Sequence, residues 1–85
     1  MKIAYAPKFE KIIVRLKKKD RKIFGQVCSE IDKIIRVPET GKPLRYSLKN
    51  RRRVHLGSFV LVYEFYNDVL CFLDFDHHDN IYKRK

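Results

Sequence analysis

The spacing of apolar residues changes once along this chain, at the loop expected over Pro38–Pro43. Before this loop, apolar side chains recur every three or four residues, which is typical of amphipathic helices. After it, they alternate with polar side chains or form short apolar runs, which is typical of strands. Helices followed by a meander of strands predict an α+β domain, with a helical pair packed on one face of an antiparallel sheet.

The first half of the chain predicts a short strand and two helices. The strand is expected over Lys2–Tyr5, and Pro7 suits the first position of a helix, where a missing N–H costs little. We expect a break at Lys17–Asp20, with Asp20 capping a second helix that ends near Val37, because a residue before proline disfavours helix. The apolar stripes are Phe9, Ile12, Ile13 and Leu16 in the first helix and Ile23, Phe24, Val27, Ile31, Ile34 and Ile35 in the second.

The second half predicts a sheet of about four strands. Residues 44–48 and 53–56 alternate between apolar and polar side chains, whereas Phe59–Tyr66 is apolar on both faces and should be central. The chain is expected to return antiparallel over Val69–Phe75 and to add a short edge strand over Asn80–Lys83. A turn or a bulge is predicted at Gly57-Ser58, and a tight turn at Asn67-Asp68.

Length and charge restrict the classes of function. Eighty-five residues predict one domain, 1–85, with a modest core. The 20 Lys and Arg outnumber the 10 Asp and Glu, giving a formal charge of +10 that favours a polyanion or an acidic protein as partner. The sequence shows neither a signal peptide nor a membrane span, so we expect a cytoplasmic protein that does not bind membranes.

Basic residues gather in the region between the helices and the central strand. From Lys42 to Arg53 the chain carries six Lys or Arg and no acidic residue, and the period of two places Arg51, Arg53 and His55 on one side of a strand. This pattern fits a phosphate-binding surface, although a solvated basic face would look the same. The candidate RNA-binding residues are Arg51, Arg52, Arg45, Lys49, Lys42, Lys18, Lys19, Lys83 and Arg84.

The C-terminal segment supplies groups for proton transfer. His77 and His78 are imidazoles, which titrate near neutrality, and Asp76 or Asp79 could hold the tautomer of either ring. A metal site could be drawn from Asp74, Asp76, His77, His78 and Asp79, because imidazole with carboxylate suits zinc or manganese. If the segment is a strand, however, the two histidines point to opposite faces, so we expect no metal and no other cofactor. Tyr82 shares the side of His78 and would either reach the same cavity or cap the core. Plain surface histidines remain the alternative.

Four segments together resemble the RelE/ParE superfamily of toxins. The segments are Gly41-Lys42-Pro43-Leu44-Arg45, Arg53-Val54-His55-Leu56-Gly57, Leu61-Val62-Tyr63-Glu64 and His78-Asp79-Asn80-Ile81-Tyr82. The resemblance implies two N-terminal helices against an antiparallel sheet of about four strands. It also implies a ribosome-dependent mRNA endoribonuclease that needs no metal, and an acidic, RelB-like cognate antitoxin that wraps the basic surface.

The resemblance also implies roles for single residues. Arg53 and His55 stand where the family has its strand cations, and Tyr82 matches a C-terminal tyrosine linked to cleavage. His78 takes the place of a common catalytic arginine, and His77 matches the histidine before it. Histidine near this tyrosine also occurs in YoeB-type toxins, where it is linked to proton transfer. The candidate catalytic residues are His78, Tyr82, Arg53, His77 and His55.

One position departs from the family pattern and keeps a second function open. Val60 stands where many active members have arginine, and valine can neither carry charge nor bind phosphate. The first hypothesis remains an mRNA endoribonuclease, with His78 in proton transfer and with Arg51 and Arg53 on the scissile phosphate. The alternative is a ParE-like inhibitor of DNA gyrase or topoisomerase without catalysis of its own. A third possibility is an RNA-binding module that inhibits nothing.

Overall fold

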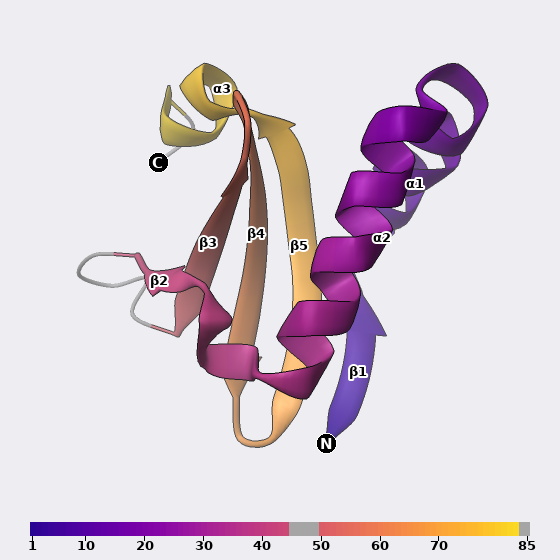
Figure 1. Ribbon diagram of the computed structural model, residues 1–85. Coiled ribbons are helices and arrows are strands. Elements are labelled where there is room, and N and C mark those ends of the chain that lie inside the picture. Colours follow the sequence, from indigo (N-terminus) through magenta and orange to yellow (C-terminus); the bar gives the residue numbers. More distant parts are fainter. Residues whose placement is uncertain (45–49, 84–85) are drawn as a thin grey trace.

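The computed structural model describes residues 1–44 and 50–83 of the chain, and within these ranges it shows one mixed sheet (Figure 1). Its strands are β1 (Lys2–Tyr5), β2 (Lys42–Pro43), β3 (Arg51–Leu56), β4 (Phe59–Tyr66) and β5 (Val69–His77). Their spatial order is β1-β5-β4-β3-β2. β1 runs parallel to β5, whereas the other neighbours are antiparallel. The predicted α+β architecture is confirmed, and the N-terminal strand joins the sheet as a parallel edge.

The two long helices are α1 (Pro7–Lys19) and α2 (Arg21–Arg36). Asp20 caps α2 as predicted, because its carboxylate accepts a 3.2 Å hydrogen bond from the backbone N–H of Ile23. The predicted break over Lys17–Asp20 is too wide, since α1 continues through Lys19. Lysine is a good helix former and its charge is favourable at a helix C-terminus, so only Asp20 interrupts the helical pair.

The core lies between the helical pair and one face of the sheet. Phe9 of α1 stacks on Phe72 of β5 with ring centres 5.7 Å apart, and both side chains are fully buried. Burying a side chain of this size contributes about 1.5–3 kcal/mol to folding. The other fully buried side chains among the described residues are those of Val27, Ile34, Val60, Leu61, Tyr63 and Leu70.

The predicted turn at Asn67-Asp68 is confirmed, with both residues at positive φ, as a tight hairpin turn of this type requires.

The connection after α2 contains more structure than the loop predicted over Pro38–Pro43. A short 3₁₀ turn, η1 (Pro38–Thr40), leads directly into β2. The buried Tyr63 hydroxyl of β4 anchors this connection: it donates to the Pro38 carbonyl at 2.7 Å and accepts from the Gly41 N–H at 2.8 Å. Most of the strand predicted over 44–48 lies outside the described residues.

The C-terminal segment forms a helix, α3 (His78–Lys83), where an edge strand over Asn80–Lys83 was predicted. That prediction is wrong because the segment has no strand to pair with: β4 begins at Phe59, which pairs with His77, the last residue of β5. The His78 N–H instead donates to the Ser58 carbonyl at 2.9 Å, and the chain turns into α3. α3 packs against β4 and β5 on the side of the sheet away from α1 and α2 (Figure 1).

Candidate active site

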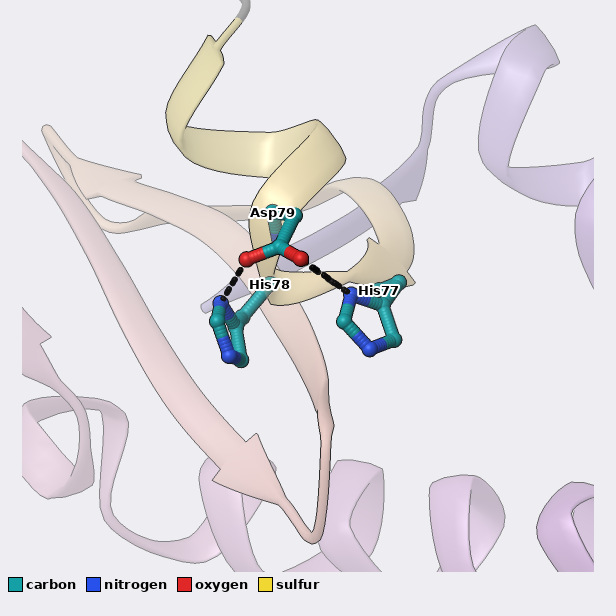
Figure 2. A group of neighbouring side chains, drawn as sticks. All are labelled: His77, His78 and Asp79. Atoms are coloured by element: carbon teal, nitrogen blue, oxygen red, sulfur yellow. Dashed lines mark hydrogen bonds and ion pairs between the residues drawn. The ribbon is translucent and has the colours of Figure 1, made fainter.

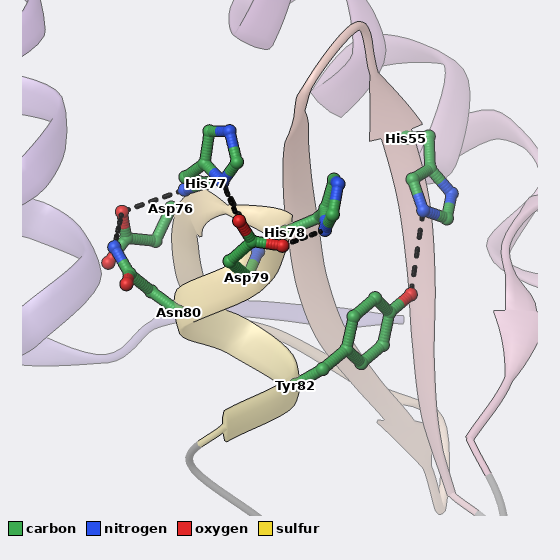
Figure 3. Close-up of polar contacts among 7 residues, drawn as sticks. All are labelled: His55, Asp76, His77, His78, Asp79, Asn80 and Tyr82. Atoms are coloured by element: carbon green, nitrogen blue, oxygen red, sulfur yellow. Dashed lines mark hydrogen bonds and ion pairs between the residues drawn. The ribbon is translucent and has the colours of Figure 1, made fainter.

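Tyr82 of α3 brings the C-terminal helix against strand β3. Its hydroxyl lies 3.5 Å from Nε2 of His55. Figure 3 marks this contact with a dashed line. The guanidinium carbon of Arg53 lies 5.8 Å from the centre of the Tyr82 ring, which is within cation–π range. Arg53 and His55 are two residues apart in β3, so they point to the same side of the sheet. Residues distant in sequence therefore meet at one place.

His78 joins this group from the first position of α3. It precedes Tyr82 by one helical turn, and the two ring centres are 6.4 Å apart. Nδ1 of His78 lies 2.9 Å from a carboxylate oxygen of Asp79. A carboxylate at this distance favours a proton on Nδ1, so in the neutral ring Nε2 keeps the free lone pair. Nε2 is therefore the nitrogen of His78 available for proton transfer.

His77 lies beside His78, at the end of β5. It belongs to β5, where it pairs with Phe59, and its ring stands edge-on to the Phe59 ring at 6.0 Å. Its Nδ1 accepts a 3.2 Å hydrogen bond from the Asp79 N–H. The expectation that His77 and His78 point to opposite faces is wrong, because the chain changes from strand to helix between them. Their ring centres are 4.9 Å apart.

Arg53 has a donor without an acceptor within the described part of the chain. Its Nη1 reaches the Pro43 carbonyl at 3.4 Å, but its Nε is buried and makes no hydrogen bond there. An unsatisfied buried donor costs about 1–3 kcal/mol, and more when it is charged. The adjacent surface is hollowed into a pocket of about 220 Å³, large enough for a phosphate group. Its lining residues are Thr40, Lys42, Arg53, Val54 and His55.

The predicted RNA-binding residues fall into four groups. Arg52 donates to the carbonyls of Gly41 at 2.8 Å and Glu39 at 3.3 Å, so it braces the connection before β2. Arg51 faces Glu64 across the sheet with 3.7 Å between Nε and the carboxylate. Exposed lysines without such a bracing role are Lys42 beside the pocket, Lys83 at the end of α3, and Lys18 and Lys19 at the end of α1. Arg45, Lys49 and Arg84 lie outside the described residues.

One residue of this site, Thr40, escaped the sequence patterns, and the structure adds the place of another, Val60. Thr40 lines the pocket beside Arg53, but nothing in its sequence context distinguishes it from any loop threonine. Val60 is fully buried and pairs with His55 in the sheet, so it lies beneath the group formed by Arg53, His55, His78 and Tyr82. The departure from the family pattern at Val60 therefore falls directly at the candidate site.

Comparisons with known proteins place the chain in a family. The model of the ParE toxin of the type II toxin–antitoxin system parDE matches residues 3–82. This chain belongs to the ParE toxin family. The toxin is also 41% identical to "Putative toxin RelE4" of Methanocaldococcus jannaschii, over 98% of this chain and 92% of that protein. The resemblance to the RelE/ParE superfamily is thus confirmed.

Solved structures confirm the fold of the toxin. The YoeB/ParE toxin from Agrobacterium tumefaciens matches with a TM-score of 0.79 at 15% identity, covering 92% of this chain and 99% of that one. The toxin–antitoxin complex RelBE2 from Mycobacterium tuberculosis matches with a TM-score of 0.72 at 21% identity, covering 89% and 95%. Within the described residues, no helix of the toxin is both long and apolar enough to cross a membrane.

Proposed function

We propose that this toxin is a ribosome-dependent endoribonuclease that cleaves mRNA without a metal ion and so inhibits translation. The observation that carries the proposal is the buried, unpaired Nε of Arg53. It lies beside a pocket of about 220 Å³, large enough for a phosphate group, and next to Tyr82, whose ring lies near the imidazoles of His55 and His78. A phosphodiester bound there would satisfy the orphan donor and bring the scissile bond close to groups that transfer protons.

The proposed reaction uses the RNA as its own nucleophile. Nε2 of His78 takes the proton of the 2′-hydroxyl, whose oxygen then bonds to the adjacent phosphorus. The bond from phosphorus to the 5′-oxygen breaks, and that oxygen takes a proton from His55, which leaves a 2′,3′-cyclic phosphate and a 5′-hydroxyl. Arg53 stabilises the charge that develops on the phosphoryl oxygens. Tyr82 orients His55 and provides a stacking surface for a base.

His77 takes no direct part in this reaction. Its ring contacts Phe59 and the His78 ring, and its Nδ1 accepts a backbone hydrogen bond. His78 reaches Tyr82 instead, and its Nδ1 lies closer to the Asp79 carboxylate, at 2.9 Å against 3.7 Å for Nδ1 of His77. We therefore propose His78 and His55 as the proton-transfer pair and leave His77 out of it.

The proposed partners follow from charge. A formal charge of +10 on 85 residues favours binding to ribosomal RNA and mRNA, with the exposed lysines of α1 extending the contact surface. The same charge would be neutralised by an acidic, RelB-like antitoxin. RelBE2 of M. tuberculosis is a toxin–antitoxin complex, and we propose that this toxin also binds a cognate antitoxin, in the cytoplasm.

The proposal is tested by mapping transcript ends. Purified toxin is added to translating ribosomes that carry a defined mRNA, with the Arg53→Ala variant as control. We expect new 5′-hydroxyl ends within the open reading frame for the wild type, and a loss of about 10²-fold or more for the variant, as when a preorganised charge-stabilising donor is removed. If messages stay intact in this assay while the same wild-type protein stops the growth of cells that express it, the nuclease is refuted.

A second function is favoured by a separate observation. The matching family model describes a ParE toxin, and Val60 is a buried apolar residue where the resemblance expects arginine. Both fit an inhibitor that binds DNA gyrase or topoisomerase and performs no catalysis. In that case induction of the toxin would cause DNA damage while translated messages stay intact. The same transcript mapping therefore separates the two functions.

A further inference from the structure

We propose that His77, His78 and Asp79 form a binding site for a zinc ion. Figure 2 shows the Asp79 carboxylate between the two imidazole rings, with one oxygen toward each. One ligand atom from each residue lies within 4.8 Å of the other two. Nδ1 of His78 is 2.9 Å from one carboxylate oxygen and Nδ1 of His77 is 3.7 Å from the other. Three potential ligands thus converge from consecutive residues.

The chemistry and spacing of these ligands suit zinc. Two imidazole nitrogens with one carboxylate form a ligand set typical of zinc sites that keep a fourth position for water. Ligands about 2.0–2.1 Å from a tetrahedral zinc ion lie roughly 3.3 Å from one another. The two nitrogen-to-oxygen distances, 2.9 and 3.7 Å, lie on either side of this value. The two distances go to different oxygens of the carboxylate, so the Asp79 side chain must rotate to place one oxygen and both nitrogens around one ion.

The fold creates the cluster by ending a strand and starting a helix at the same point. A continuous strand would send His77 and His78 to opposite faces. Here the His78 N–H is held by the Ser58 carbonyl at 2.9 Å, so the chain turns immediately after His77. All three side chains are accessible from solvent, at 43%, 46% and 61% exposure in chain order, so an ion can enter without any opening of the fold.

Zinc would replace two existing interactions. At His77 it takes the lone pair of Nδ1, which now accepts from the Asp79 N–H at 3.2 Å. At His78, zinc binds Nδ1 in place of the proton that the Asp79 carboxylate favours on that nitrogen. The neutral ring then carries its proton on Nε2. A His78 ring with zinc on Nδ1 and a proton on Nε2 has no lone pair left for a base. This consequence rests on the proposed function, and it makes zinc an inhibitor of cleavage.

The site is tested by zinc binding to the toxin without a histidine tag. Competition with a chromogenic chelator should show one tight zinc ion per chain for the wild type. His77→Gln and Asp79→Asn each remove one ligand and should weaken that binding at least tenfold. His55→Gln is the matched control: it removes the third histidine of the chain, which lies outside the cluster, and should bind zinc as the wild type does.

The outcomes separate the zinc site from the nuclease. Wild-type affinity in His77→Gln, or an equal loss in His55→Gln, would overturn the site, provided that circular dichroism shows each variant folded. In ribosome-dependent cleavage assays, zinc should inhibit the wild type at concentrations at which His77→Gln still cuts. If zinc binds as expected but no preparation cuts RNA, the nuclease fails and the metal site stands.

Discussion

The Tyr82 ring lies 5.8 Å from the guanidinium carbon of Arg53 and ties the C-terminal helix to the third strand. The Tyr82 hydroxyl is also 3.5 Å from His55 Nε2, so a single side chain orders two candidate catalytic groups. α3 has six residues and contacts β4 and β5, and Tyr82 extends its contacts to β3. Displacing α3 would therefore remove Tyr82 and His78 from the site together.

Substitutions of Tyr82 should separate the role of its ring from the role of its hydroxyl. Tyr82→Phe keeps the ring over Arg53 but loses the polar contact with His55, which is worth about 1 kcal/mol, or roughly fivefold in rate. Tyr82→Ala also removes the stacking surface, which is worth about 1–3 kcal/mol per base. Cleavage rates on ribosome-bound mRNA should fall in the order wild type, Phe, Ala. Equal rates for the Phe and Ala variants would show that the ring has no role.

Substitution of His78 should abolish most of the activity and leave the fold intact. His78→Gln keeps the size and polarity of the side chain but cannot exchange a proton, so cleavage should fall about 10²- to 10⁴-fold. The matched control is His77→Gln, one residue earlier, which should keep most of the wild-type rate in zinc-free buffer. The urea unfolding midpoints of both variants should stay close to that of the wild type, because both side chains are about half exposed.

Elements with a clear period were predictable from sequence. Phe59–Tyr66 is the central strand as predicted, and α2 begins after Asp20 and ends before Val37, because these boundaries depend on local chemistry. The parallel pairing of β1 with β5 was not predictable in the same way. It joins the two ends of the chain, and no local pattern specifies such a distant neighbour.

The candidate site was predictable in its residues and less so in its geometry. Arg53 and His55 share a side of β3 because of the strand period, and the structure brings both to Tyr82. The proximity of His77 to His78 does not follow from the sequence, because a strand over this segment sends the two rings to opposite faces. A helix of six residues is too short for its apolar positions to show a period, so its onset at His78 depends on packing and on the bond to Ser58.

Two glycines should respond to alanine in opposite directions. A Cβ added at Gly41 would lie 2.8 Å from the Arg53 carbonyl oxygen and 2.9 Å from the Tyr63 hydroxyl, so backbone or a buried ring must move. We expect Gly41→Ala to cost roughly 1–3 kcal/mol of unfolding free energy. Gly25 lies inside α2 with nothing within 4 Å of such a Cβ, so Gly25→Ala should stabilise by about 0.5–1 kcal/mol. Urea denaturation measures both, and a neutral Gly41→Ala would contradict the close packing of the β2 connection.

The hydroxyl of Tyr63 should stabilise the toxin at neutral pH and lose this effect in alkali. Tyr63→Phe leaves the Gly41 N–H and the Pro38 carbonyl without their buried partner, which should cost about 1–3 kcal/mol of unfolding free energy. Tyr66→Phe is the matched control, because Tyr66 is 57% exposed, and it should change little.

The pH dependence follows from the burial of Tyr63. Burial raises the pKa of its phenol above 10.0, against the smaller opposing effect of the Gly41 hydrogen bond. Above about pH 10 the unfolded chain therefore loses this proton while the folded chain keeps it, and the unfolded state is favoured. The stability difference between wild type and Tyr63→Phe should be full at pH 8 and should shrink as the pH rises past about 10. A difference that stays constant in urea titrations at pH 8 and pH 10.5 would show that the Tyr63 phenol titrates equally in both states.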